Sequence, residues 1–201
     1  MPKNLILDLG GVILDIDFKL THLAFEAAGV SGFDQLYDQH KAAPFFVDFE
    51  KGKIPTEQFF GHIREICDCP LSDETIRDCW NALVIGFDPA KVNWLFEMAD
   101  RYNLFLFSNT NIVHYQCFAP LFYQQWQRDF NTIFQKAYYS HEMGLRKPAA
   151  DSFQFILNEQ QLDPANTIFV DDTIANVKTA EELGMQGIFL EKPKAVLELG
   201  L

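Results

Sequence analysis

The stretch that decides the fold is residues 5–12, LILDLGGV, in which an apolar run ends at Asp8 and two glycines follow. Three more short apolar runs, rich in branched and aromatic residues, occur at 104–109, 167–172 and 187–190, and a weaker one lies at 137–140. Continuous apolar runs of this length are typical of strands buried on both faces, as in a parallel sheet covered by helices.

Helical patterns separate these runs. Apolar stripes predict helices at 89–102, beginning at Pro89 after Asp88, at 149–160, and at 174–183, ending near Gly184. Strands that alternate with helices predict right-handed βαβ units. We therefore expect an α/β fold with a doubly wound, Rossmann-like parallel sheet.

One segment breaks this alternation. Residues 18–85 carry helical patterns only, with Thr56 as an expected N-cap and Ser72 opening a further helix. So long a helical stretch after the first strand predicts a small inserted helical domain. The expected boundaries are 1–16 and 86–201 for the core and 17–85 for the insert.

Composition narrows the functional classes. The chain has 201 residues, with 28 acidic against 16 basic, a net charge of −12 and 48% hydrophobic residues, which is typical of a globular protein. Its acidity argues against nucleic acid or an anionic membrane as partner, because both need a basic face. No apolar run is long enough to span a membrane, and no signal-peptide pattern opens the chain. We expect a soluble cytoplasmic protein, and the sequence carries no signal for its oligomeric state.

Polar residues end three of the apolar runs. Asp8 ends the first, Ser108-Asn109 the second and Asp171-Asp172 the third, and Lys147 follows the weaker run at 137–140. Ligands of open α/β sheets bind at the carboxyl ends of the strands. Carboxylates beside buried strands need compensation, and an oxygen-binding divalent cation supplies it, with Mg²⁺ the expected ion.

Each of these residues has a plainer interpretation. The aspartates could be turn residues, Ser108 could cap the next helix, and Lys147 could be a solvated surface residue. Taken together and in this order, they favour a reactive site over surface polarity.

The four polar segments resemble the signatures of the haloacid dehalogenase-like (HAD) hydrolases. These segments are 8–12 (DLGGV), 108–109 (SN), 144–148 (GLRKP) and 169–172 (FVDD), with Asn176 following. The resemblance covers essentially the whole chain, and the insert at 18–85 stands where that family has its helical cap. Within the family, the chain is most similar to bacterial sugar phosphatases of the α-D-glucose-1-phosphatase type.

The resemblance implies a nucleophile and a metal site. Asp8 would attack phosphorus and form an aspartyl-phosphate that water hydrolyses. Asp8, the backbone carbonyl of Gly10 and Asp172 would hold Mg²⁺, with Asp171 as a further ligand or acting through water.

The resemblance also implies a phosphate site. Ser108 would donate its hydroxyl, Asn109 its backbone N–H and Lys147 a positive charge to the phosphoryl group, and Gly11 would belong to the same binding loop.

Gly10 departs from the family pattern. Most family phosphatases have a second Asp here, which protonates the leaving group, and general acid catalysis is worth roughly 10²–10⁴-fold. Either the leaving group needs little help, as with an anomeric sugar oxygen, or Asp15, Asp17 or a cap side chain supplies the proton, or the protein is a poor enzyme.

These considerations favour a Mg²⁺-dependent phosphatase for small phosphorylated metabolites, such as a hexose 1-phosphate. A metal-independent 2-haloacid dehalogenase is the alternative, although it would leave Asp171 and Asp172 without a cation. A weakly active regulatory or binding protein is the third possibility. The aromatic segment 44–52 resembles the family's specificity segment, although its phenylalanines could equally form the core of the cap; Arg146 could meet substrate or pair with an acid.

Overall fold

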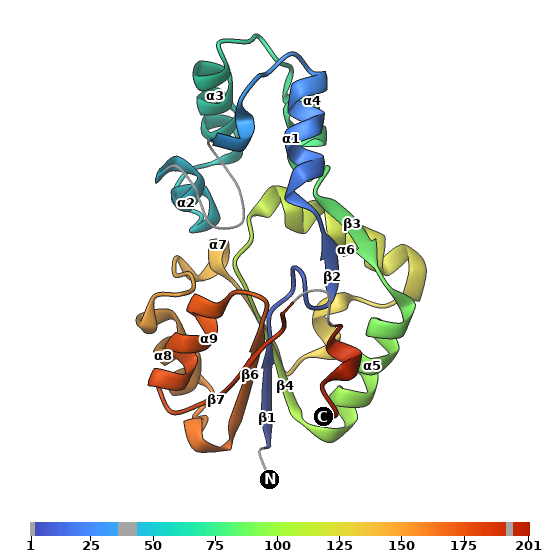
Figure 1. Ribbon diagram of the computed structural model, residues 1–201, viewed down its shortest axis with the longest axis vertical. Coiled ribbons are helices and arrows are strands. Elements are labelled where there is room, and N and C mark those ends of the chain that lie inside the picture. The colour runs from blue at the N-terminus through green and yellow to red at the C-terminus, as the bar shows by residue number, and fades with distance from the viewer. Residues whose placement is uncertain (1–2, 36–43, 192–194) are drawn as a thin grey trace.

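The sheet confirms the expected fold class. The structure, a computed structural model, describes residues 3–35, 44–191 and 195–201. Its main sheet has the strands β1 (Asn4–Leu7), β4 (Asn103–Ser108), β5 (Lys136–Tyr139), β6 (Thr167–Asp171) and β7 (Gln186–Phe189). They are ordered β5-β4-β1-β6-β7 with every neighbouring pair parallel, which is the doubly wound arrangement (Figure 1).

The apolar runs form strands because both of their faces are covered. Leu5 and Leu7 pack into a core cluster on one face of the sheet, whereas Ile6 packs into a separate cluster on the other face. This alternation is the two-residue period of a strand. Continuous apolar sequence is therefore required in β1, which is fully buried.

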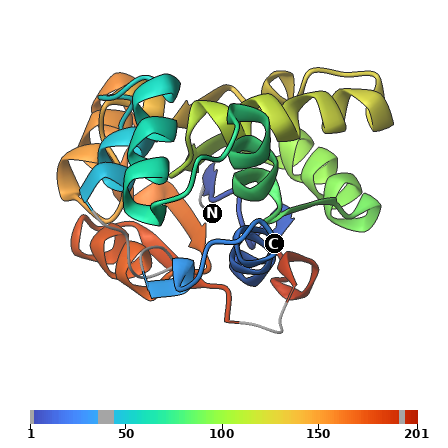
Figure 2. The same ribbon diagram turned by 90° about the horizontal axis from the view of Figure 1, so that it is seen from above.

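Helices cover the two faces. The helices α5 (Pro89–Arg101) and α6 (Ile112–Trp126) share the core cluster of Leu5, whereas α8 (Ala150–Glu159) and α9 (Ile174–Glu182) share that of Ile6. Seen from above, the two pairs lie on opposite sides of the molecule (Figure 2). The short helix α7 (Ser140–Met143) follows β5.

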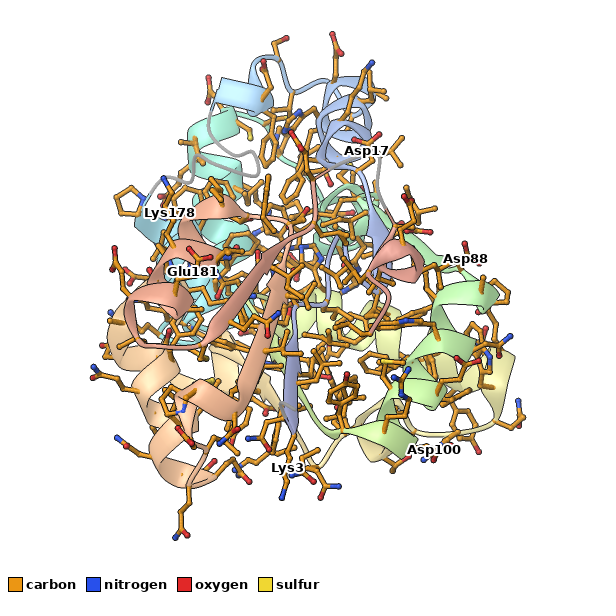
Figure 3. The ribbon with its side chains drawn as sticks, turned by 60° about the horizontal axis from the view of Figure 1, so that its bottom comes forward. Lys3, Asp17, Asp88, Asp100, Lys178 and Glu181 are labelled. Carbon is orange, nitrogen blue, oxygen red and sulfur yellow. The ribbon has the colours of Figure 1, made fainter. Side chains whose placement is uncertain are left out.

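Aspartate side chains cap two of the helices, but the expected threonine cap of a third is absent. Asp88 accepts a hydrogen bond from the backbone N–H of Ala90 and caps α5, and Asp17 caps α1 in the same way through Lys19; both aspartates lie at the surface (Figure 3). The expectation that Thr56 is an N-cap is wrong. That residue is the first residue of α3, and the preceding proline occupies the cap position without a side-chain hydrogen bond.

The insert has an aromatic core of its own. It consists of α1 (Phe18–Ala27), α2 (Pro44–Glu50), α3 (Thr56–Cys67) and α4 (Asp73–Asn81). The rings of Phe49 and Phe59 stack at 3.9 Å between centroids, and those of Phe46 and Trp80 stack at 5.4 Å. Phe46 and Phe49 are therefore core residues of the insert, which was one of their two expected roles.

A two-stranded antiparallel ribbon joins the insert to the core. Its strands are β2 (Leu14–Ile16) and β3 (Val84–Phe87). The expectation of helix alone throughout 18–85 is thus wrong at its end, where β3 begins. These strands are only partly buried, and their pairing partners lie about 70 residues apart in the chain, which no local pattern reports. The ribbon lies where the domain boundaries are predicted, and the boundaries themselves stay a prediction.

Among the described residues, no helix combines the length and the apolar character needed to cross a membrane.

Candidate active site

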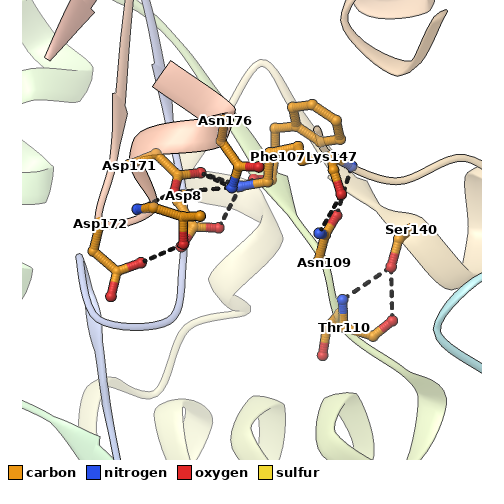
Figure 4. A network of polar contacts seen from close by, with 10 residues as sticks. Asp8, Phe107, Asn109, Thr110, Ser140, Lys147, Asp171, Asp172 and Asn176 are labelled. Atoms are coloured by element: carbon orange, nitrogen blue, oxygen red, sulfur yellow. Dashed lines mark hydrogen bonds and ion pairs between the residues drawn. The ribbon is translucent and has the colours of Figure 1, made fainter. Parts of the chain in front are cut away.

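Three carboxylates meet at the carboxyl end of the sheet. Asp8 follows β1, Asp171 ends the neighbouring strand β6, and Asp172 comes next (Figure 4). The register of the two strands pairs Leu7 with Val170, so the residues that follow leave the sheet side by side. One carboxylate oxygen from each aspartate lies within 4.8 Å of the others.

Lys147 links two of these aspartates. Its Nζ donates to Asp8 Oδ1 at 2.6 Å, to Asp171 Oδ2 at 2.6 Å and to the carbonyl oxygen of Phe107 at 2.7 Å. An ammonium group has three N–H donors, so all three are used. Burial by itself lowers the pKa of Lys147, but the carboxylates of Asp171 and Asp8 raise it above its ordinary value.

Asp171 is held by several donors besides Lys147. Asn176 Nδ2 lies 3.0 Å from each of its two oxygens, and the backbone N–H of Thr173 donates to Oδ1 at 2.8 Å. Asp171 is also completely buried. Asp171 was expected either to bind the cation directly or to act on it through a water molecule. This geometry favours the second role, because the oxygens of Asp171 already accept hydrogen bonds from protein groups.

The cluster carries more negative than positive charge. Desolvation by burial, with help from Asp171 and Asp172, raises the pKa of Asp8 to about 7, although Lys147 opposes this change. A bound cation favours the ionised form of carboxylates beside it. The donors are all oxygens, which is the ligand type that Mg²⁺ prefers. The residues present therefore fit a magnesium ion.

Gly11 leaves space for the carboxylate of Asp172. Its φ of +78° is in the left-handed region, and a Cβ atom at this position would overlap the carboxylate of Asp172. Only glycine accommodates both conditions. At Gly10, by contrast, a Cβ would lie 2.8 Å from Ile16 Cδ1, so an isoleucine from the ribbon fills the space that a side chain at position 10 would enter.

Side-chain hydrogen bonds to the backbone hold the loops next to the end of β4 in place. Asn109 Nδ2 donates to the carbonyl of Lys147, and the backbone N–H of Lys147 donates to Asn109 Oδ1, both at 2.9 Å. The hydroxyl of Ser140 accepts from the backbone N–H of Thr110 at 2.9 Å and donates to its carbonyl at 2.8 Å. Sequence reasoning expected Asn109 to act through its backbone. It missed both sets of side-chain hydrogen bonds, because the paired residues lie 30 to 38 positions apart.

A pocket adjoins the cluster and lies between core and insert. It is partly open, and its empty space amounts to about 430 Å³ when the adjoining open solvent is included. Its lining residues are Leu9, Gly10, Leu14, Ile16, Phe18, Glu50, Leu83, Val84, Ser108, Asn109, Thr110, His114 and Phe118. Gly10, Ser108 and Asn109 therefore line the same pocket.

The insert contributes a carboxylate to this pocket from the segment 44–52, which sequence reasoning compared with the family's specificity segment without giving Glu50 a role of its own. Glu50, the last residue of α2, is buried and its Oε2 lies 3.0 Å from Nη2 of Arg146. Arg146 thus pairs with an acid, which was one of its two expected roles. Asp15 and Asp17, the expected replacements for the missing acid, have other partners, since Asp15 pairs with Lys91 at 2.5 Å and Asp17 caps α1.

The fold and this constellation define a class of protein. The model of the haloacid dehalogenase-like hydrolase family matches residues 2–184, and the chain belongs to that family.

Individual relatives make the comparison more specific. The chain is 30% identical over 188 residues to a D-ribitol-5-phosphate phosphatase of Bacteroides thetaiotaomicron, covering 92% of this chain and 90% of the relative. It is 26% identical to the sesquiterpene phosphatase astK of Aspergillus oryzae, covering 94% and 89%. The structure of a HAD family enzyme from Bacteroides thetaiotaomicron, in complex with magnesium and inorganic phosphate, superposes with a TM-score of 0.88 at 28% identity, covering 96% of both chains.

Proposed function

We propose that the chain hydrolyses phosphate monoesters of sugars or sugar alcohols through an aspartyl-phosphate on Asp8. The enzyme is a phosphoric monoester hydrolase, and its cofactor is Mg²⁺. The observation that carries the proposal is the cluster of Asp8, Asp171 and Asp172, in which Lys147 pairs with Asp8 and Asp171. Relatives that are named as phosphatases or were solved with magnesium and phosphate support it.

The cation would be held by Asp8, the backbone carbonyl of Gly10 and Asp172, with Asp171 acting through water. When bound, Mg²⁺ supplies positive charge that offsets the repulsion between carboxylate and phosphate and neutralises charge on the phosphoryl oxygens. Gly11 leaves room for the carboxylate of Asp172 in this arrangement.

Asp8 would act as nucleophile. Its free oxygen forms the new bond to phosphorus while the bond from phosphorus to the leaving-group oxygen breaks, and water then hydrolyses the aspartyl-phosphate and regenerates the carboxylate. Lys147 holds Asp8 Oδ1 at 2.6 Å, which orients the carboxylate and favours its ionised, nucleophilic form.

Ser108 and Asn109 would bind the phosphoryl group. Ser108 is buried at the end of β4 and lines the pocket beside Gly10. Its hydroxyl would donate to a phosphoryl oxygen, as would the backbone N–H of Asn109. The positive charge of Lys147 would act on the phosphate across Asp8, since its three donors are already used.

The missing acid at Gly10 bears on the substrate. A hexose 1-phosphate releases an anomeric oxygen, which needs less protonation than an ordinary alcohol, and it is one substrate that we propose. A sugar alcohol phosphate is the other, supported by the relative that is named for ribitol 5-phosphate. A metal-independent dehalogenase has no use for the excess of carboxylates, so we favour the phosphatase.

Hydrolysis of p-nitrophenyl phosphate tests the proposed function. We expect activity with Mg²⁺ that stops on adding EDTA and that Asp8→Asn abolishes. Asp151→Asn, an exposed aspartate of α8, is the matched control and should retain activity. Full activity in EDTA, or halide release from a 2-haloacid without metal, would contradict the proposal.

A further inference from the structure

Glu50 and His114 are polar residues of the pocket lining that have no part in the mechanism above. Glu50 enters from α2 of the insert, and His114 enters from the first turn of α6 in the core. The rest of the wall away from the cluster is largely apolar and comes from the ribbon and from Phe18 and Phe118. Glu50 and His114 therefore line the same pocket as Ser108, where we propose that the phosphoryl group binds.

Glu50 is the acidic member of this pair of residues. It is 6% exposed and is the one carboxylate among the described residues that line the pocket. Its pairing with Arg146 balances its charge, which makes a buried ionised carboxylate tolerable. A carboxylate has about four acceptor positions, so the ion pair leaves capacity for further donors.

His114 offers a hydrogen-bond acceptor as well. Its ring stacks on Trp80 at 5.0 Å between centroids, and its Nδ1–H donates to Asn81 Oδ1 at 3.0 Å. The proton on Nδ1 leaves a lone pair on Nε2. That atom is buried and has no hydrogen-bond partner among the described residues. Burial lowers the pKa of His114 to about 3, so the ring is neutral in the physiological range.

We infer that Glu50 and His114 accept hydrogen bonds from hydroxyl groups of the substrate, and thereby select a polyhydroxylated leaving group over a hydrocarbon one. The inference rests on the proposed function and names which residues determine its substrate class. A sugar alcohol supplies O–H donors to both acceptors, whereas its C–H groups contact the apolar wall. A hydrocarbon chain would fit that wall but offer no donor to His114 Nε2, which costs free energy that a hydroxyl group recovers.

A pair of matched esters tests this inference. Ribitol 5-phosphate and 1-pentyl phosphate both release a primary alcohol from a five-carbon chain and differ in their other hydroxyl groups. We expect the wild-type enzyme to favour ribitol 5-phosphate in kcat/KM by at least about 100-fold. In Glu50→Gln and in His114→Phe, which keeps a ring against Trp80, this ratio should fall by about 10-fold or more. Glu57→Gln, an exposed glutamate of the insert, should keep the wild-type ratio.

The outcomes separate the inference from the proposed function. A wild-type ratio near one, or variants that lower kcat/KM for both esters equally, would overturn the inference while Mg²⁺-dependent hydrolysis of p-nitrophenyl phosphate upholds the phosphatase. Absence of that hydrolysis in the wild type would overturn the proposed function and the inference with it. Thermal melts of each variant identify loss of folding, and Glu50→Gln, which conserves shape, decides the question if His114→Phe unfolds.

Discussion

Gly11 has a left-handed backbone conformation and lies against Asp172, a proposed ligand of the cation. Gly11→Ala would bring a Cβ onto the carboxylate of Asp172 and impose left-handed strain of about 1–2 kcal/mol. We expect the Mg²⁺ concentration for half-maximal activity to rise by about 10-fold or more, because the carboxylate must move. Magnesium titrations of p-nitrophenyl phosphate hydrolysis measure this effect.

Gly29 provides the matched control for that change. Its φ is +92°, but nothing lies within 4 Å of a Cβ built there. Gly29→Ala should therefore lose a similar amount of stability and keep the wild-type magnesium dependence. If both alanine variants show the same magnesium dependence, the clash with Asp172 has no role in binding the cation.

His114 makes stability depend on pH in a defined direction. Burial lowers its pKa in the folded state from 6.5 to about 3, so between these values the unfolded chain binds a proton that the folded chain does not. The free energy of unfolding therefore falls as the pH drops below 6.5, by about 1.4 kcal/mol per pH unit, or about 2 kcal/mol at pH 5. Urea unfolding at pH 7 and pH 5 measures the loss, which His114→Phe should reduce. An equal loss in that variant would assign the pH dependence to other groups.

Among the elements, α2 and the turn after it seat the insert on the core. Gly52 has a φ of +63°, and a Cβ there would overlap the backbone carbonyl of His141 in α7. Gly52→Ala should displace the insert, carrying Glu50 with it, and lower kcat/KM for a sugar phosphate by about 10- to 100-fold. Steady-state kinetics tests this. Gly61→Ala in α3 is the control, since a Cβ at that position meets nothing within 4 Å. Unaltered kinetics in Gly52→Ala would show that this contact does not position the insert.

The elements that sequence alone predicted share a physical property. The buried strands β1, β4 and β6 require continuous apolar runs, and α5 has an apolar stripe with an Asp-Pro start, so each carries a local pattern. The strands β2 and β3 have three and four residues, and only their mutual pairing makes them strands. Their formation depends on a long-range contact that no local period reveals.

At the scale of the whole molecule, metal binding should stabilise the fold. Three carboxylates face one ammonium at the site, in a chain whose net charge is −12. A ligand at 100 times its Kd that binds only the folded state adds about 2.7 kcal/mol to the free energy of unfolding. We expect Mg²⁺ to raise the unfolding midpoint relative to EDTA in the wild type and in Asp151→Asn, and to lose this effect in Asp172→Asn. A midpoint that Mg²⁺ raises equally in Asp172→Asn would contradict the assigned ligand.

The sequence by itself determined the α/β class, the helical insert and the polar residues at the strand ends. A strand that is buried on both faces needs a continuous apolar run, so a carboxylate at the end of such a run is visible in the sequence. Only the tertiary structure decided how these residues act together. Lys147 meets Asp8 across 139 positions of sequence, and Arg146 meets Glu50 from the insert. Nε2 of His114 is buried without a hydrogen-bond partner among the described residues. Contacts between such distant residues depend on how the layers pack, and packing leaves no local pattern to read.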